Sequence, residues 1–81
     1  MRRPSLEPDD LLALLNWELA AYEECAGTRF TSIRPFPARD DIGCNWVDAG
    51  FATDHRMALD EQFIVHHIVE QTRRRFDLTI H

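Results

Sequence analysis

The chain has 81 residues, of which 44% are hydrophobic, and it carries a formal net charge of −5. This length fits one small domain, and this apolar content argues against a wholly disordered chain. An acidic balance makes the chain a poor electrostatic partner for phosphate backbones, and no run approaches the roughly 20 apolar residues of a membrane span. All nine basic residues are Arg, which we interpret as the codon usage of a GC-rich, bacterial genome.

The first predicted element is a helix over residues 6–26, with Ser5 as its N-cap, Pro8 in its first turn and Gly27 just beyond its end. Its apolar side chains cover about 220° of the helical wheel, whereas an arc of roughly 100° is enough to pack on one core. An apolar surface this wide needs a second packing partner. The helix therefore predicts a larger assembly, and a homodimer is the form we favour. One flank of this helix carries Leu14, Trp17, Ala21 and Cys25.

Two runs rich in β-branched and aromatic residues predict strands over residues 29–36 and 44–53. The polar connection between them, residues 37–43, has the composition of a turn, and Gly50 is a candidate β-bulge. An antiparallel hairpin is the natural pairing of the two strands. A two-stranded sheet is marginal alone, which again favours dimerisation, either by joining two hairpins or by packing the helix flanks together.

A second helix is predicted from Asp54 or Asp60 to about Phe76. Its core stripe consists of Ile64, Val65, Ile68, Val69, Thr72 and Phe76, and its opposite side carries Leu59, Phe63, His66, His67, Glu70 and Arg74. With residues 1–4 as a flexible arm and 77–81 as a tail, the pattern predicts one small α+β domain. Its order is helix, β-hairpin, helix, with both helices packed on a small antiparallel sheet that dimerisation completes.

The nearest approach to a metal-ligand cluster is His66, His67 and Glu70 on the second helix. Two of these side chains could converge on one ion, but a zinc site needs a third ligand, and the two-His helical signature is missing. We therefore favour a solvated face on which Glu70 pairs with Arg73, Arg74 or a His.

Other reactive side chains also have simpler interpretations. Cys25 and Cys44 are expected to be reduced, packed thiols, because secreted minidomains carry more cysteines and no apolar signal segment follows residues 1–3. Several acidic residues near His55 fit turn chemistry better than paired carboxylates or a calcium loop: Asp40, Asp41, Asp48 and Asp54.

The basic and aromatic residues offer the last candidate site. Residues 73–75 with Arg2 and Arg3 are the only basic density, and they would form a nucleic-acid groove only with Arg29, Arg34 and Arg39 on the same surface. Three aromatic side chains could stack on bases, but we expect them in the core: Phe30, Phe36 and Trp46.

Taken together, the sequence predicts a small, acidic, cytoplasmic protein that acts by protein contact, without catalysis, cofactor or metal. It would be a homodimer, or a subunit or inhibitor of a larger partner, such as a phage- or plasmid-type inhibitor that occupies a basic site. The predicted interface contains either Leu14, Trp17 and Ala21 or Leu59, Phe63 and His67. The alternative is a nucleic-acid-associated regulator that uses its Arg clusters, and a metal- or thiol-dependent enzyme is less favoured.

Overall fold

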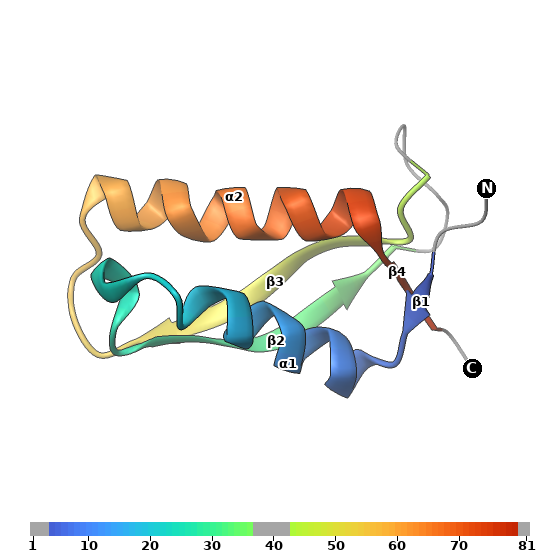
Figure 1. Cartoon of the computed structure of the whole chain (residues 1–81), viewed down its shortest axis with the longest axis horizontal. Coiled ribbons are helices and arrows are strands. Elements are labelled where there is room, and N and C mark those ends of the chain that lie inside the picture. Colours follow the sequence, from blue (N-terminus) through green and yellow to red (C-terminus); the bar gives the residue numbers. More distant parts are fainter. Residues whose placement is uncertain (1–3, 37–42, 80–81) are drawn as a thin grey trace.

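The computed structural model describes residues 4–36 and 43–79, and in these ranges it contains two α-helices and two small sheets (Figure 1). This arrangement confirms the predicted α+β class. No helix in these ranges is long and apolar enough to cross a membrane. In chain order the elements are β1 (Ser5–Leu6), α1 (Pro8–Leu19), the short 3-10 helix η1 (Glu23–Cys25), β2 (Thr28–Pro35), β3 (Trp46–Thr53), α2 (Leu59–Arg75) and β4 (Asp77–Leu78).

The larger sheet is formed by β2 and β3, which pair antiparallel with Phe30 opposite Phe51. Both helices lie along this hairpin (Figure 1). The register is irregular in two places, between Phe30 and Ser32 and between Arg34 and Pro35. The first lies at Gly50, as predicted, but the extra residue belongs to β2. Gly50 lies directly opposite Ser32, and a Cβ at this position would collide with the Ser32 hydroxyl. The glycine therefore makes room for the bulged partner strand.

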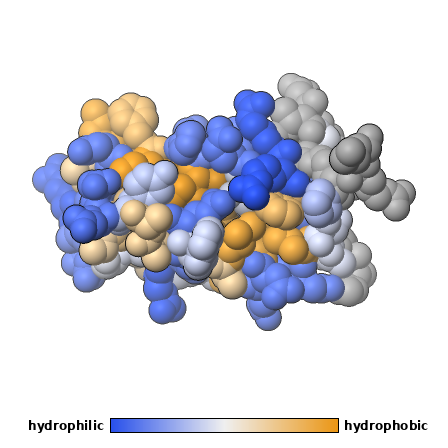
Figure 2. Space-filling model, in the orientation of Figure 1, coloured by the Kyte–Doolittle hydropathy of each residue, from blue (hydrophilic) through white to orange (hydrophobic). Residues whose placement is uncertain are grey.

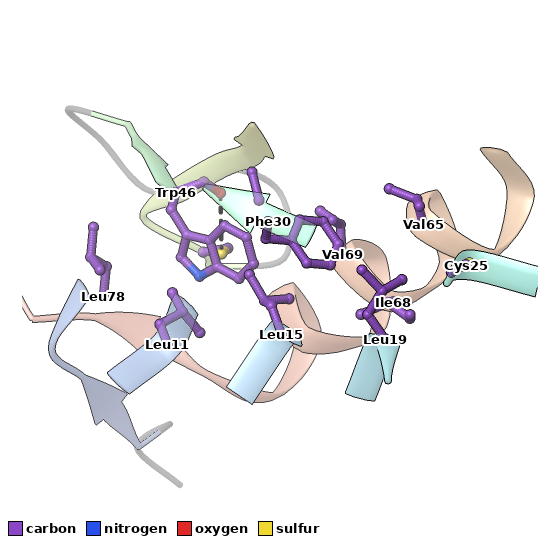
Figure 3. Close-up of a cluster of buried hydrophobic side chains, with 12 residues drawn as sticks. Leu11, Leu15, Leu19, Cys25, Phe30, Trp46, Val65, Ile68, Val69 and Leu78 are labelled. Carbon is purple, nitrogen blue, oxygen red and sulfur yellow. Dashed lines mark hydrogen bonds between the residues drawn. The ribbon is translucent and has the colours of Figure 1, made fainter. Parts of the chain in front are cut away.

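The core lies between the helices and the hairpin (Figure 3). The indole of Trp46 is fully buried and donates a hydrogen bond from Nε1 to the carbonyl oxygen of Phe76, 3.0 Å away. Trp46 and Phe30 are thus core residues as predicted, whereas Phe36 is 38% exposed. The other buried apolar residues are Leu11, Leu15, Leu19, Cys25, Cys44, Ala49, Val65, Ile68, Val69 and Leu78.

The first helix is shorter than predicted at both ends. It begins after Glu7, which has no side-chain capping bond, and Ser5 belongs to β1 instead. It ends at Leu19, because the chain must turn back to enter β2, and Gly27 with φ 86° leads into that strand. This turn buries Cys25, so part of the wide apolar arc is absorbed within one chain.

The second helix begins at Leu59 with Ala58 as its N-cap, so neither Asp54 nor Asp60 caps it. Of the predicted stripe, Ile64 and Phe76 are half-buried and the other four residues are buried. The acidic side chain of Glu61 is buried as well. The sequence did not predict a buried acid there. Its partner, His55, lies in the loop before the helix, and the helical period carries no information about that loop.

Residues 77 and 78 form a strand where a tail was predicted. They pair in parallel with β1, Ser5 opposite Asp77 and Leu6 opposite Leu78, and both are buried. The side chain of Asn45 continues this small sheet: Nδ2 donates to the carbonyl of Leu78 and Oδ1 accepts from its N–H, each at 2.7 Å. The two ends of the described chain are therefore fastened together.

Candidate functional site

Large apolar side chains remain exposed on the outer sides of α1 and α2. Trp17 is 75% exposed, Leu59 67% and Phe63 65%. Figure 2 shows apolar patches that interrupt the hydrophilic surface on one side of the molecule. Single exposed apolar residues are common, but residues that gather around a depression mark an interaction site.

Two neighbouring hollows connect these side chains. Trp17, Ala21 and His67 line a hollow of about 350 Å³ between the helices, and Phe63 and His67 line a second of about 500 Å³. Tyr22 lines both. Residues of the two alternative predicted interfaces thus lie around the same pair of hollows. We name this region, together with Tyr22, the helix-face surface: Trp17, Ala21, Tyr22, Phe63 and His67. Of the other predicted interface residues, Leu14 is half-buried and Leu59 is exposed, and neither lines these hollows.

Polar contacts fix the two helices beside the first hollow. Glu18 of α1 accepts a hydrogen bond from Oγ1 of Thr72 at 3.1 Å and forms an ion pair with Arg75 at 3.4 Å. Thr72 is buried, and the Arg75 guanidinium also lies 5.2 Å above the ring of Phe76. The groups that hold α1 against α2 therefore fix the shape of the helix-face surface before any partner binds.

Two arginines of residues 73–75, Arg73 and Arg75, contact different parts of the molecule. Arg73 donates from Nε to the carbonyl of Trp46 at 2.9 Å and pairs with Glu70 at 3.2 Å, which is the pairing expected for Glu70. Arg75 pairs with Glu18. The other arginines of the predicted groove include Arg2, Arg3 and Arg39, which lie outside the described residues.

The predicted metal-ligand candidates His66, His67 and Glu70 all line the second hollow. Across residues 4–36 and 43–79, no three His, Cys, Asp or Glu side chains are placed to hold a metal ion. Glu70 instead shares its carboxylate with Arg73. The geometry of these residues fits a surface for contact better than a coordination site.

Both cysteines are buried thiols. Burial raises the pKa of the Cys25 thiol, and the nearby carboxylates of Glu61 and Glu24 raise it further. A raised pKa disfavours the thiolate, which is the nucleophilic form. Cys44 donates a hydrogen bond from Sγ to the carbonyl of Trp46 at 3.4 Å. Both thiols are packed in the core, and the raised pKa of Cys25 disfavours its nucleophilic form.

A cluster that was not predicted joins the end of β3 to the start of α2. His55 contacts Asp54 through Nδ1 at 2.8 Å and the two carboxylate oxygens of Glu61 through Nε2 at 2.8 and 2.9 Å. The bond to Asp54, and then the bond to Glu61, raise the pKa of His55. The turn interpretation missed Glu61, which lies in the first turn of α2 and reaches back across the loop. With both ring nitrogens engaged, His55 acts as a brace between two elements.

The remaining predicted acids take no part in this cluster. Asp48 pairs with Arg34 at 2.9 Å on the hairpin, and Asp40 and Asp41 lie outside the described residues. No known protein family, curated protein or solved structure matches the chain. In the part of the chain that the structure describes, the helix-face surface is where exposed aromatic side chains gather around hollows.

Proposed function

We propose that the chain is a small protein-interaction protein without catalytic activity that acts as a homodimer, and that the helix-face surface is its contact. The supporting observation is the concentration of exposed aromatic side chains, Trp17, Tyr22 and Phe63, around two adjoining hollows. Trp and Tyr contribute more binding energy per residue than most side chains, because they bury a large apolar area.

The helix-face surface offers both an exposed aromatic side chain and adjoining hollows, which supports a two-fold dimer. Under two-fold symmetry the same patch meets itself, so each copy must offer both a projection and a depression. Trp17 projects from α1 at the first hollow, and the adjoining second hollow is lined by Tyr22, Phe63 and His67. Trp17 of each copy would fill the hollow of the other, which buries both aromatic groups at once.

The two alternative functions use other features of the chain. As an inhibitor or subunit of a larger protein, the chain would offer the same aromatic residues and its net charge of −5 to a basic site. As a nucleic-acid-associated regulator it would need its arginines, but Arg73 already donates to the carbonyl of Trp46 and Arg75 pairs with Glu18. The dimer is the option that the exposed aromatic residues favour most.

The test is sedimentation of three proteins at micromolar concentration: the wild type, Trp17→Glu and Ala52→Glu. Ala52 is exposed on β3 opposite Arg29, so Ala52→Glu adds the same charge away from the helix-face surface. We expect the wild type and Ala52→Glu to sediment as dimers and Trp17→Glu as a folded monomer. A monomeric wild type, or equal association of both variants, would contradict the proposal.

A further inference from the structure

The two edges of the β2–β3 hairpin differ in whether another strand can join them. On the β2 side, the side chain of Asn16 imitates a neighbouring strand: Oδ1 accepts from the N–H of Phe30 at 2.7 Å, and Nδ2 donates to its carbonyl at 3.0 Å. Both backbone groups of Phe30 therefore point away from β3 and are already bonded. The middle of the β2 edge is closed.

The geometry of the ladder then defines the β3 edge. Phe30 lies opposite Phe51, and in an antiparallel pair the residues that do not bond each other both direct their N–H and C=O outwards. Phe51 and, two residues on, Thr53 thus present backbone donors and acceptors on the far side of β3. Near its start the strand is covered, because the carbonyl of Trp46 accepts from Arg73. The open stretch is the second half of β3.

A groove of about 600 Å³ lies between β3 and α2, and it reaches the open stretch at Gly50 and Phe51. Four consecutive residues of β3 form one wall, from Asp48 to Phe51, and no residue of β2 takes part. The α2 side is apolar where Val65 and Val69 line it, with Gln62 and His66 also contributing. Met57, in the loop before α2, completes the lining. The groove therefore combines a row of backbone hydrogen-bonding groups with an apolar floor.

The widths of the elements explain why the groove exists. A helix with its side chains is about 10 Å across, whereas neighbouring strands are about 4.8 Å apart. Two helices side by side are thus wide enough for about four strands, and this hairpin supplies two. Side chains of α2 therefore border the space beside β3, where they line the groove with residues of β3 and none of β2.

We propose that this groove binds an extended peptide segment of another protein, which joins β3 as an added strand. Its apolar side chains, at alternate positions, would face Val65 and Val69. Its polar side chains would face solvent, as Arg34 and Asp48 do on the outer face of the hairpin. Basic residues at the polar positions would complement the net charge of −5.

The occupant is a peptide segment and not a second copy of this chain. Antiparallel pairing of β3 with the β3 of a second copy places both α2 helices on the same face of the joined sheet. In each copy the side chains of α2 line the groove beside β3, so a second copy would bring its own α2 into the space that these side chains border. A peptide without a helix of its own avoids this conflict. The groove contains none of the residues that define the helix-face surface, although His66 lines both the groove and the second hollow.

The test uses an acetylated, amidated hexapeptide that alternates arginine and valine, and it follows backbone amide exchange by NMR. At nine-tenths occupancy, exchange of the Phe51 and Thr53 amides should slow about tenfold, while the Phe30 amide stays unchanged. The matched control is the same peptide with N-methylated valines, which cannot donate to β3 and should cause no slowing. Trp17→Glu should bind the peptide like the wild type, so the test is separate from the dimer proposal.

Three results would overturn the proposal. The first is no slowing at Phe51 and Thr53 at millimolar peptide, and the second is equal slowing by the N-methylated peptide. The third is protection of these amides that rises with protein concentration in the absence of peptide, because a second copy would then occupy the edge.

Discussion

Replacing Asn16 with alanine should destabilise the fold well beyond what is normal for a half-buried polar residue on a helix. The substitution removes both hydrogen bonds to the backbone of Phe30, a residue that is only 2% exposed. Each bond contributes about 1 kcal/mol net, and a buried backbone group left without a partner costs about 1–3 kcal/mol. Alanine regains about 0.5 kcal/mol in helix propensity. The expected net loss is about 2–3 kcal/mol.

Urea unfolding at one fixed protein concentration measures this loss directly, and thermal unfolding should show a drop of about 10–20 °C for a domain of this size. Asn16→Asp is the matched control, because it keeps an acceptor for the Phe30 N–H and loses only the donor, so its loss should be smaller. Asn16→Ala should also self-associate more readily, since the β2 edge is then open. If Asn16→Ala unfolds within 0.5 kcal/mol of the wild type, the account of the closed edge is wrong.

Three further predictions concern the residues around the end of the hairpin. Because the pKa of His55 is raised in the folded state, its contribution to stability is complete below about pH 6.5 and is lost as pH rises through the folded pKa; a series of urea titrations should show this, and His55→Gln should flatten it. Gly27→Ala should lower stability by more than about 1 kcal/mol in the same assay, because φ is 86° and the new Cβ would collide with Asp54. Cys25 and Cys44 should react with a thiol reagent such as dithionitrobenzoate only as fast as the protein unfolds, and rapid labelling under native conditions would contradict their burial.

The α+β class and the inner face of α2 were predictable because they depend on local periodicity. The helical period of 3.6 places Val65, Ile68 and Val69 on one side, and all three are buried. Two runs of β-branched and aromatic residues likewise sufficed to locate β2 and β3. Burial of Trp46 and Phe30 followed from their size in so small a chain.

The end of α1 and the strand β4 were not predictable, because tertiary contacts decide them. Nothing local distinguishes residues 20–26 from a continued helix, but the chain must reverse there to place β2 beside α1. In the same way, residues 77–78 become a strand because β1 and the side chain of Asn45 supply partners from distant parts of the sequence.

The candidate surface was predictable residue by residue but not as a whole. The wheels of the two helices identified Trp17 and Phe63 as apolar residues outside the core, and both are exposed. That His67 would complete one hollow with Trp17 depends on how α1 packs against α2, which no spacing within either helix encodes. The open edge of β3 has the same origin, since it depends on Asn16 closing the other edge.

The central claim, that Trp17 lies in a dimer contact, is tested most directly by acrylamide quenching of tryptophan fluorescence as a function of protein concentration. The chain has two tryptophans: Trp46 is fully buried and provides a constant background, whereas Trp17 is 75% exposed in one copy. The account predicts that quenching is strong in dilute protein and weakens as the concentration rises into the micromolar range, in parallel with dimer formation. Quenching of Trp17 that stays equally strong while the protein dimerises, or at all concentrations, would contradict it.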